Sequence, residues 1–282
     1  KKTERKFLYY TGTPCSYLKP FINYVIDDSK LRFVDASNEG DAVAIASGVT
    51  LAGGRSVVMF QNSGLGNAVN PLTSLSYTFK IPILLIITLR GEPGGAPDEP
   101  QHELMGKITT DMLDVMKIPW SYFPQNESKI VPTFDKVDQY LKTEQRPYAL
   151  VMKKGDVEPY ELKTLPSNIT QNSKGFFEDS FPKNSGDRFS RTDALRIIQK
   201  SIAPNTVIIS TTGKSGRELY ELGDRSNQLY MVGSMGCALP LGLGIALHNP
   251  SLNVIVLDGD GALLMRTGSM ATVGAYAPPN LT

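Results

Sequence analysis

The sequence predicts an α/β protein built from two doubly wound parallel-sheet domains. Strand-length apolar runs alternate with helical patterns along most of the chain, which is typical of parallel sheets covered by helices on both faces. Residues 254–257 form a continuous aliphatic run and residues 81–89 are nearly all apolar, as expected for strands buried on both faces. The polar, proline-containing stretch 156–187 interrupts the alternation. We therefore expect a first domain at 1–155, a linker at 156–187 and a second domain at 188–282.

In the first half, the apolar runs of strand length are the expected strands, at residues 6–10, 31–34, 55–60, 81–89 and 148–152. Helical spacing or alanine-rich composition marks the expected helices, at residues 18–26, 42–52, after the glycine-rich turn 61–67, and at 103–116. Gly53 and Gly54 are expected to end the second of these helices.

In the second half, the expected strands lie at residues 207–210, 228–232 and 254–257, and the expected helices at 191–202, 217–222 and up to 247. Each of the three strands runs into a turn rich in Gly, Ser or Thr before the next helix. In one parallel sheet these turns would converge on a single anion-binding site at the helix N-termini. Three ordinary strand-to-helix turns are the alternative.

The composition excludes several classes of protein. The 282 residues carry a net charge of +1, which provides no basic surface for nucleic acid or for an anionic membrane. Two cysteines are too few for a disulfide framework, so a reducing cytoplasm is expected. Two histidines leave few groups for histidine-based acid–base catalysis, which favours chemistry carried by a cofactor.

Gly259-Asp260-Gly261 follows the strand at 254–257. Ligands of open α/β sheets bind at the carboxyl ends of strands, and a carboxylate between two glycines can hold a Mg²⁺ that in turn holds phosphate oxygens. Taken alone, the motif is more often a plain turn.

The motifs together resemble those of thiamine-diphosphate enzymes, and more closely those of the phosphonopyruvate decarboxylase family. The matching stretches cover nearly the whole chain and lie at residues 38–42, 61–71, 90–94, 98–102, 212–214, 232–236 and 259–261. The resemblance implies that the two domains are the pyrimidine-binding and diphosphate-binding domains of this enzyme type. It also implies thiamine diphosphate and Mg²⁺ as cofactors.

The resemblance further implies the roles of individual residues. Glu39 is the catalytic carboxylate that hydrogen-bonds the aminopyrimidine of the cofactor, although the sequence without the resemblance favours an ordinary acid at a helix N-terminus. Asp260 is the metal ligand. The remaining expected cofactor-binding residues are Gly213, Lys214, Ser234, Met235, Gly236, Gly259, Gly261 and Ala262. Met235 matches the residue that supports the bent cofactor, and simple core packing is its alternative.

The substrate is expected to carry two anionic groups and therefore to need hydrogen-bond donors. The candidates near the reacting end are Ser16, Asn62, Ser63 and Asn67. Arg90 and His102 are expected at the phosphonate, because a forked guanidinium suits its oxygens. A solvated loop arginine is the alternative for Arg90.

The family's metal motif continues to an asparagine further along, and Asn280 lies too early to be that ligand. We therefore expect the second domain to be incomplete at its C-terminal end in this sequence, without the second side-chain ligand of the metal.

The resemblance implies decarboxylation of 3-phosphonopyruvate in phosphonate biosynthesis. Sulfopyruvate decarboxylase and a non-catalytic binding protein that retains the fold are the alternatives. It also implies at least a homodimer with active sites between subunits, in which Ala42, Ala46, Leu65 and the small-residue helix after Met235 offer apolar surface for a second chain to cover. A small 2-oxo acid is the other expected partner, with no nucleic acid and no membrane.

Overall fold

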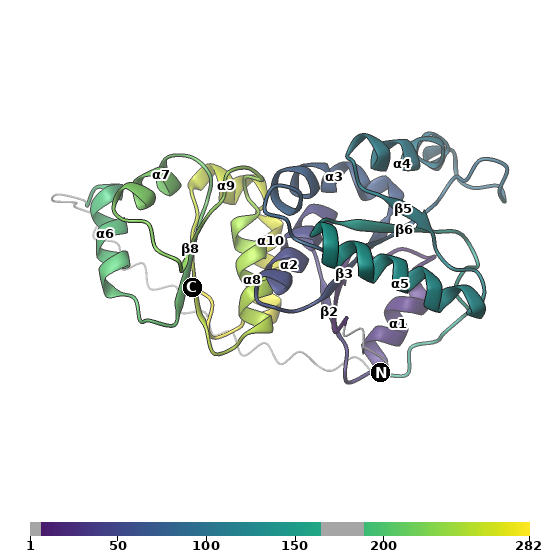
Figure 1. The fold of residues 1–282 in the computed structure, drawn as a ribbon, viewed down its shortest axis with the longest axis horizontal. Helices are drawn as coiled ribbons and strands as arrows, with labels where there is room; N and C mark the ends of the chain where they lie inside the picture. Colours follow the sequence, from purple (N-terminus) through teal and green to yellow (C-terminus); the bar gives the residue numbers. More distant parts are fainter. Residues whose placement is uncertain (1–6, 165–188) are drawn as a thin grey trace.

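The computed structural model describes residues 7–164 and 189–282 and contains two parallel β-sheets (Figure 1). Six strands form the first sheet and three form the second, each followed by helices. The predicted α/β class with two parallel-sheet units is therefore confirmed. Within the expected linker, residues 165–187 lie outside the described part of the chain.

The first sheet has the strand order β2-β1-β3-β4-β6-β5, with every neighbouring pair parallel. Its strands are β1 (Tyr9–Gly12), β2 (Arg32–Asp35), β3 (Ser56–Gln61), β4 (Leu84–Thr88), β5 (Trp120–Tyr122) and β6 (Tyr148–Met152). Its helices are α1 (Lys19–Asp27), α2 (Glu39–Leu51), α3 (Leu65–Asn70), α4 (Glu103–Val115) and α5 (Glu127–Glu144). Shorter helical turns occupy η1 (Asn62–Gly64), η2 (Pro71–Ser76) and η3 (Pro100–His102).

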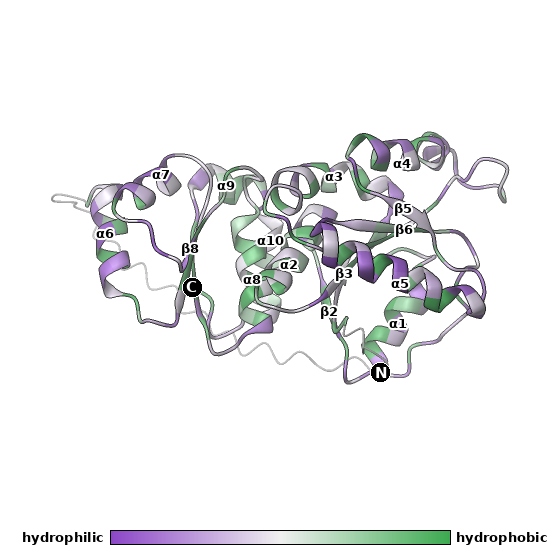
Figure 2. Cartoon of the chain, in the orientation of Figure 1, coloured by the Kyte–Doolittle hydropathy of each residue, from purple (hydrophilic) through white to green (hydrophobic). Residues whose placement is uncertain are grey.

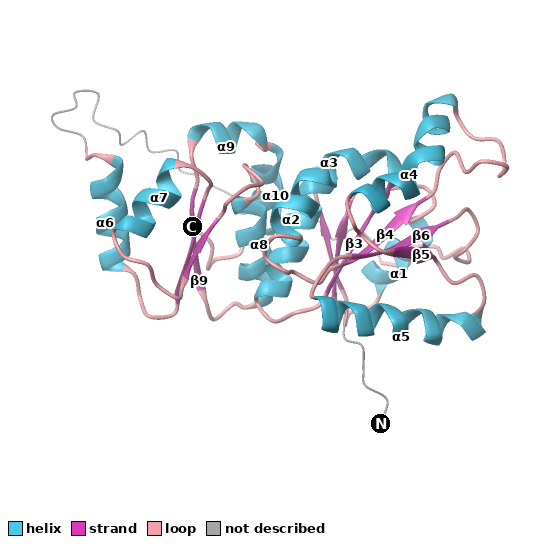
Figure 3. Ribbon diagram, turned by 45° about the horizontal axis from the view of Figure 1, so that its top comes forward, coloured by secondary structure: helices cyan, strands magenta, loops and turns pink. Residues whose placement is uncertain are grey.

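Both faces of this sheet are covered, as its apolar strands predict. Successive side chains of a strand point to opposite faces. Along β3, Val57 and Met59 therefore join the cluster beneath α1 and α5, whereas Val58 and Phe60 join the cluster beneath α2 and α3. Figure 3 shows the strands between α5 on one side and α3 on the other.

The sequence-based prediction lacks one strand of the first sheet, β5, and one helix that packs on this sheet, α5. The strand β5 has three residues at the edge of the sheet. The helix α5 is mostly exposed, buries Val137 and Leu141, and contains Pro132. An edge strand and a polar helix of this kind leave little periodic apolar signal in the sequence.

The second sheet has the order β8-β7-β9, again with parallel neighbours. Its strands are β7 (Thr206–Ser210), β8 (Gln228–Tyr230) and β9 (Asn253–Leu257). Its helices are α6 (Arg191–Ser201), α7 (Lys214–Glu221), α8 (Ala238–His248), α9 (Asp260–Met265) and α10 (Gly268–Tyr276). α6 and α7 pack on one face through Leu195 and Leu219, and α8 packs on the other.

Helices α2 and α8 lie side by side between the two sheets (Figure 1). Both are apolar nearly all round, as expected for buried helices, and Figure 2 shows α8 hydrophobic along its length. They approach closely at glycines: a Cβ on Gly48 would lie 2.0 Å from the carbonyl oxygen of Leu241, and one on Gly244 would lie 2.1 Å from that of Ile45. One continuous apolar core therefore joins both sheets.

This packing corrects one expectation. Ala42, Ala46 and Leu65 each have 0% exposure within the single chain, and α8 is buried as well. The expectation that these residues offer surface to a second chain is wrong, because other helices of the same chain cover them.

The last residues pair with the second sheet on the outer side of β9. Leu281 forms a parallel bridge with Val254, and the side chain of Asn280 donates to the carbonyl oxygens of Ala246, Asn249 and Leu252. Asn280 thus lies beside the C-terminal end of α8 and the amino end of β9. This is the opposite end of that strand from Asp260, so its exclusion as a metal ligand agrees with the structure.

Within residues 7–164 and 189–282, no helix combines the length and the apolar character needed to cross a membrane.

Candidate active site

The carboxyl ends of both sheets face the same side of the molecule, the upper side in Figure 1, where α3, α4, α7 and α9 begin. The predicted site residues come from these strand ends and from the loops that follow them. Parallel α/β sheets bind ligands at this edge.

Glu39 is the first residue of α2 and is half-buried at the carboxyl edge of the first sheet. Its Oε1 accepts a hydrogen bond from the hydroxyl of Thr13 at 3.0 Å, and its Oε2 accepts one from Nδ2 of Asn67 at 2.8 Å. The space beside it is closed by Gly64, where a Cβ would lie 2.3 Å from the Glu39 carboxyl. The carboxylate is therefore held in one orientation by two donors, one from the loop after β1 and one from α3.

The N-terminus of α2 is also tied to the second sheet unit. Arg266, just after α9, donates from one guanidinium nitrogen to Oδ1 of Asn38 and to Oδ1 of Asp41, each at 2.8 Å. Asn38 is the N-cap of α2 and accepts from the backbone N–H of Asp41. Burial raises the pKa of Asp41, and the neighbouring Arg266 acts against that rise. A buried ion pair thus lies two residues from Glu39.

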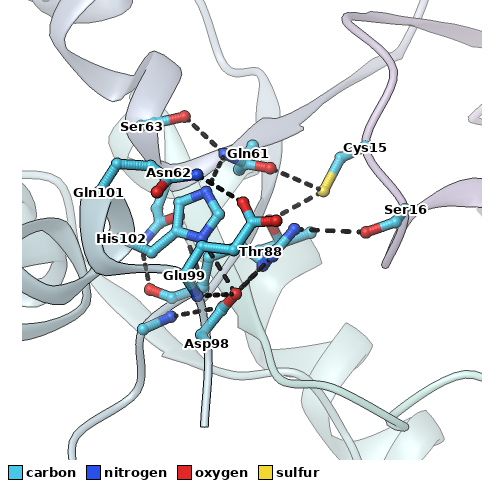
Figure 4. A network of polar contacts seen from close by, with 12 residues as sticks. Cys15, Ser16, Gln61, Asn62, Ser63, Thr88, Asp98, Glu99, Gln101 and His102 are labelled. Carbon is cyan, nitrogen blue, oxygen red and sulfur yellow. Dashed lines mark hydrogen bonds and ion pairs between the residues drawn. The ribbon is translucent and has the colours of Figure 1, made fainter.

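Residues from the glycine-rich turn after β3 continue this edge. Gln61 donates from Nε2 to the hydroxyl of Ser63 at 2.7 Å, and its Oε1 accepts from the thiol of Cys15 at 3.4 Å (Figure 4). Ser63 and Asn67, both predicted to face substrate, are exposed. The structure therefore brings Ser63 and Asn67 to the same edge as Glu39.

Arg90 and His102 lie in one polar network with Asp98 between them. Figure 4 shows His102 beside Asp98 within this network. Arg90 donates to the Asp98 carboxylate from Nε at 2.7 Å and from an NH₂ group at 2.5 Å. Nδ1 of His102 lies 3.0 Å from the same carboxylate. The other guanidinium nitrogen of Arg90 donates to the hydroxyl of Ser16 at 3.4 Å. Three predicted substrate residues, Ser16, Arg90 and His102, are therefore neighbours.

Asn62 is fully buried beneath this loop. Its Nδ2 donates to the carbonyl oxygen of Arg90 at 2.9 Å and to the hydroxyl of Thr109 at 3.0 Å, and its Oδ1 accepts from the backbone N–H of Arg90. The side chain of Asn62 thus holds the main chain of Arg90 in place. The main chain at Gly91 also passes close to that of His102: a Cβ on Gly91 would lie 2.1 Å from the carbonyl oxygen of His102.

In the second sheet, the turns after β7, β8 and β9 lie side by side, as the order β8-β7-β9 requires. Gly213 has a φ of +100°, and a Cβ there would meet no atom within 4 Å, so the chain before α7 leaves open space. Ser234 is buried and its hydroxyl donates to Oδ1 of Asn70 at 3.2 Å, which joins this turn to the end of α3. The three turns are therefore neighbours, and their use as one anion-binding site stays a prediction.

Two buried polar atoms at this edge fit a bound polar group. Oγ1 of Thr211 and Oδ2 of Asp258 follow the adjacent strands β7 and β9, and neither has a partner at standard hydrogen-bond geometry within the described residues, although the Thr211 hydroxyl lies near enough to the Asp258 carboxyl to lower its pKa. Burial raises the pKa of the Asp258 carboxyl. Buried polar atoms are nearly always partnered, so this edge suits a ligand that supplies hydrogen-bonding or charged groups. The geometry therefore fits the diphosphate end of the cofactor.

Asp260 is exposed at the first position of α9, where a single carboxylate meets the N-terminus of a helix. Among the described residues, no three His, Cys, Asp or Glu side chains gather as a metal site. Mg²⁺ commonly binds through one or two carboxylates together with waters and phosphate oxygens, so one carboxylate beside a diphosphate fits it. Met235 reaches this place: its Cε lies 3.1 Å from where a Cβ on Gly261 would be.

The other predicted cofactor residues lie around these strand ends. Lys214 is exposed at the start of α7, Gly236 lies in the turn after β8 with a φ of +87°, and Ala262 is buried in α9. A cavity of about 470 Å³ opens next to Gly213, lined by Thr212, Arg217, Tyr220, Tyr230, Met231 and Val232 among others. The second sheet thus offers an open volume at the predicted anion site.

Six residues near the site have no role that the sequence predicts, namely Thr13, Gln61, Asp98, Thr211, Asp258 and Arg266. Asp98 lies within a motif that is already informative, four residues before His102, and this spacing is the one signal that pointed to it. Arg266 has no such signal, because its partner is 225 residues away in the chain.

Comparison with known proteins gives the class. A family model described as the thiamine pyrophosphate enzyme N-terminal TPP binding domain matches residues 3–110. A second model, for the C-terminal TPP binding domain of the same enzymes, matches residues 212–282. The chain is therefore a thiamine pyrophosphate enzyme, with thiamine diphosphate as the cofactor of both domains.

The relatives narrow this class. A phosphonopyruvate decarboxylase of Streptomyces viridochromogenes is 45% identical over 271 residues, which cover 96% of this chain and 67% of the relative. A sulfopyruvate decarboxylase of Methanosarcina acetivorans is 27% identical over 275 residues, which cover 95% of this chain and 68% of that protein. The chain belongs to the phosphonopyruvate decarboxylase family. It spans about two thirds of the length of these curated relatives.

The fold is also similar to that of a solved thiamine diphosphate-dependent 4-hydroxybenzoylformate decarboxylase from Rhodococcus jostii. The TM-score is 0.69 at 12% sequence identity, and the match covers 98% of this chain and 82% of that chain. At this identity the likeness concerns the fold alone.

Proposed function

We propose that the full protein decarboxylates 3-phosphonopyruvate to phosphonoacetaldehyde and CO₂ in phosphonate biosynthesis, such as that of 2-aminoethylphosphonate, with thiamine diphosphate and Mg²⁺ as cofactors. In this reaction the bond between C1 and C2 breaks, CO₂ leaves, and a proton is added at C2. When bound, thiamine diphosphate supplies the electron sink that no side chain provides. The protein residues supply binding, orientation and proton transfer.

In this proposal Glu39 holds a proton against the aminopyrimidine nitrogen of the cofactor. Thr13 and Asn67 support the assignment, because they keep both carboxylate oxygens in place at 3.0 and 2.8 Å. A general acid or base must first lie within hydrogen-bond reach of the atom with which it exchanges a proton, and only then does its pKa matter. The two donors restrict the rotation of the Glu39 carboxylate.

In this proposal the residues at the carboxyl end of the second sheet bind the diphosphate end of the cofactor. We assign Asp260 to Mg²⁺, and the cofactor contacts to Gly213, Lys214, Ser234, Met235, Gly236, Gly259, Gly261 and Ala262. The unpartnered buried atoms of Thr211 and Asp258 and the open space at Gly213 support this assignment.

The observation that carries the substrate proposal is the contact between Arg90 and Ser16. Their side chains come from two loops 74 residues apart, and they meet at 3.4 Å at the sheet edge that also carries Glu39. Hydroxyl and guanidinium donors at one place suit a phosphonate or carboxylate group. His102, Ser63 and Asn67 lie along the same edge, and Asn62 supports Arg90 from below.

CO₂ release tests the proposal directly. The full-length protein, with thiamine diphosphate and Mg²⁺, is compared on phosphonopyruvate, sulfopyruvate and pyruvate, and phosphonopyruvate is expected to give the highest kcat/KM. A preference for sulfopyruvate would support the sulfonate alternative. A preference for pyruvate would refute both readings, and no CO₂ from any of them would support a non-catalytic binding role.

We also propose that the protein forms at least a homodimer with active sites between subunits, and that it works in the cytoplasm. The helices α9 and α10 support the first point, because Leu264, Met265 and Met270 expose 75%, 61% and 50% of their surface beside the cofactor edge. The free thiols of Cys15 and Cys237 support the second.

Mixing chains tests the shared site. Inactive Glu39→Gln chains and inactive Asp260→Ala chains are combined under conditions in which subunit exchange is measured separately. Recovered activity is expected, because one site of a mixed dimer escapes both substitutions. Complete exchange without recovery would mean that each site is built within one chain.

A further inference from the structure

Asp98 accepts hydrogen bonds from five groups of its own loop. Its Oδ2 accepts from Nε of Arg90 at 2.7 Å and from the backbone N–H of Gly91 at 3.0 Å. Its Oδ1 accepts from an NH₂ group of Arg90 at 2.5 Å and from the backbone N–H of Glu99 at 2.8 Å, and Nδ1 of His102 lies 3.0 Å away. The Arg90 guanidinium, with these other donors, holds the pKa of the Asp98 carboxyl far below its ordinary value. Asp98 is therefore an ionised carboxylate that can only accept hydrogen bonds.

The two sides of the His102 ring then have different roles. Because the Asp98 carboxylate only accepts, Nδ1 of His102 must carry a hydrogen. On the other side, Nε2 of His102 lies 3.3 Å from the amide nitrogen of Gln61 (Figure 4). That amide group only donates, and its oxygen is directed to the thiol of Cys15. Nε2 of His102 must therefore accept, which makes the ring a neutral imidazole with its hydrogen on Nδ1.

The same carboxylate determines what Arg90 can offer a ligand. Two of its three guanidinium nitrogens are engaged by Asp98, so its positive charge is compensated. The remaining nitrogen donates to Ser16, and the guanidinium carbon lies 4.9 Å from the centre of the Tyr17 ring. Arg90 is thus aimed at the Ser16 end of the site as a directional donor.

We propose that Asp98 is a positioning residue of the active site, which holds His102 as the Nδ1–H tautomer and aims the guanidinium nitrogen of Arg90 beside Ser16 toward the anionic group of the substrate. The inference rests on the proposed function, which assigns Arg90 and His102 to the substrate. Asp98 lies behind both residues and acts through them. Partners of this kind typically change activity by about 10–100-fold when they are removed.

Nitrogen NMR of the imidazole rings tests the tautomer independently of activity. In the ¹⁵N-labelled full-length protein, the signals of His102 are those that disappear in His102→Gln. We expect a protonated Nδ1 and an unprotonated Nε2 at neutral pH. A protonated Nε2 with an unprotonated Nδ1, a doubly protonated ring, or averaged signals of a mixture would overturn the proposal.

Asp98→Asn changes one atom of the side chain and removes its charge. We expect His102 to lose its single tautomer, kcat to fall by about 10–100-fold, and KM for phosphonopyruvate to stay within about threefold, because Arg90 becomes uncompensated and still attracts an anion. Glu99→Gln is the matched control: Glu99 is exposed in the same loop, its side chain bonds Gln101, and neither the tautomer nor kcat should change. An unchanged kcat and tautomer in Asp98→Asn, or an equal effect of Glu99→Gln, would contradict the positioning role.

These outcomes separate the inference from the proposed function. If the full-length protein proves inactive on phosphonopyruvate but its His102 shows the Nδ1–H tautomer that Asp98→Asn abolishes, the proposed substrate fails and the positioning role stands. If the enzyme is active and His102 shows another tautomer, the positioning role fails alone.

Discussion

Replacing Arg266 with methionine leaves the Asp41 carboxylate without the cation that lies 2.8 Å from it. The exposed fractions of the two side chains are 14% for Arg266 and 0% for Asp41, so the pair is a buried one. Breaking such a pair by removing one partner typically destabilises a protein by about 3–5 kcal/mol, because the remaining charge stays buried. Methionine keeps the aliphatic packing of the arginine stem, so the change in stability reports mainly the lost charge.

Protonation sets an upper bound on this loss. An aspartic acid with its ordinary pKa of 3.8 takes up a proton at pH 7 at a cost of about 4 kcal/mol, and at pH 5 at a cost of about 1.6 kcal/mol. Asn38 also continues to donate to Oδ2 of Asp41 at 3.1 Å. We therefore expect Arg266→Met to lower the free energy of unfolding by about 3 kcal/mol at pH 7.

The loss should shrink on acidification. Burial raises the folded-state pKa of Asp41, and removing Arg266 raises it further. A carboxyl group with a raised folded-state pKa binds its proton more tightly when folded, so its contribution to stability is present at low pH and is lost as the pH rises. Arg266→Met should therefore cost no more than about 1.6 kcal/mol at pH 5.

Urea denaturation of the full-length protein at pH 7 and pH 5 measures both values. Arg196→Met is the matched control, since Arg196 pairs with Asp193 on the surface at exposed fractions of 44% and 47%, where a pair contributes about 0–1 kcal/mol. The double variant Arg266→Met/Asp41→Asn should recover much of the loss, because no unpaired charge remains. A loss below about 1 kcal/mol, or one equal at both pH values, would refute the reasoning.

Three further predictions follow from the site and the helix pair. Glu39→Gln should slow hydrogen exchange at the thiazolium carbon of the bound cofactor by about 10²–10⁴-fold and leave cofactor affinity within a few-fold; unchanged exchange, followed by NMR, would remove Glu39 from its role. Asp260→Ala should weaken thiamine diphosphate binding about tenfold or more when Mg²⁺ is present, and calorimetry that finds the wild-type affinity independent of Mg²⁺ would contradict this. Gly48→Ala should lower the melting temperature, because its Cβ would lie 2.0 Å from the carbonyl oxygen of Leu241. Gly66→Ala is the control: its Cβ would meet no atom within 4 Å, so it should be neutral or stabilising by about 0.5–1 kcal/mol. Equal melting temperatures of the two variants would count against the close packing of α2 and α8.

The strands of both sheets were predictable because burial on both faces leaves a continuous apolar run. Residues 81–89, for example, predict such a strand, and every residue of β4 (Leu84–Thr88) is buried. Residues 254–257 also predict a strand, and β9 occupies Asn253–Leu257, but β9 is an edge strand in which only Val254 is buried, so the expected burial on both faces is wrong there. The edge strand β5 and the polar helix α5 lack such runs and were missed. The pattern of α2 predicts a helix but not its partner, because a helix that is apolar on every side gives no indication of which surface it will meet.

The candidate site likewise contains some residues that the sequence identifies and others that it does not. Glu39 and Asp260 belong to motifs that a resemblance can identify, and each lies at a strand end where function is expected. Arg266 acts through contacts with residues far from it in the chain, whereas Asp98 acts through contacts within its own loop. The partners of Arg266 are set by how α9 and α10 approach α2, which the spacing of residues along the chain does not express. The partners of Asp98 are set by how its loop closes, and of these only His102, four residues away, gives a signal in the spacing.

These contacts give α2 two functions at once. Its buried length joins the two sheets through α8, and its first residue is Glu39. Arg266 bonds both the N-cap Asn38 and the first-turn Asp41, so the second sheet unit directly determines where α2 begins. Thr13 and Asn67 then orient the Glu39 carboxylate from the first sheet unit. A substitution at Arg266 should therefore disturb proton transfer at Glu39 as well as stability, even though Arg266 makes no contact with that carboxylate within the described residues.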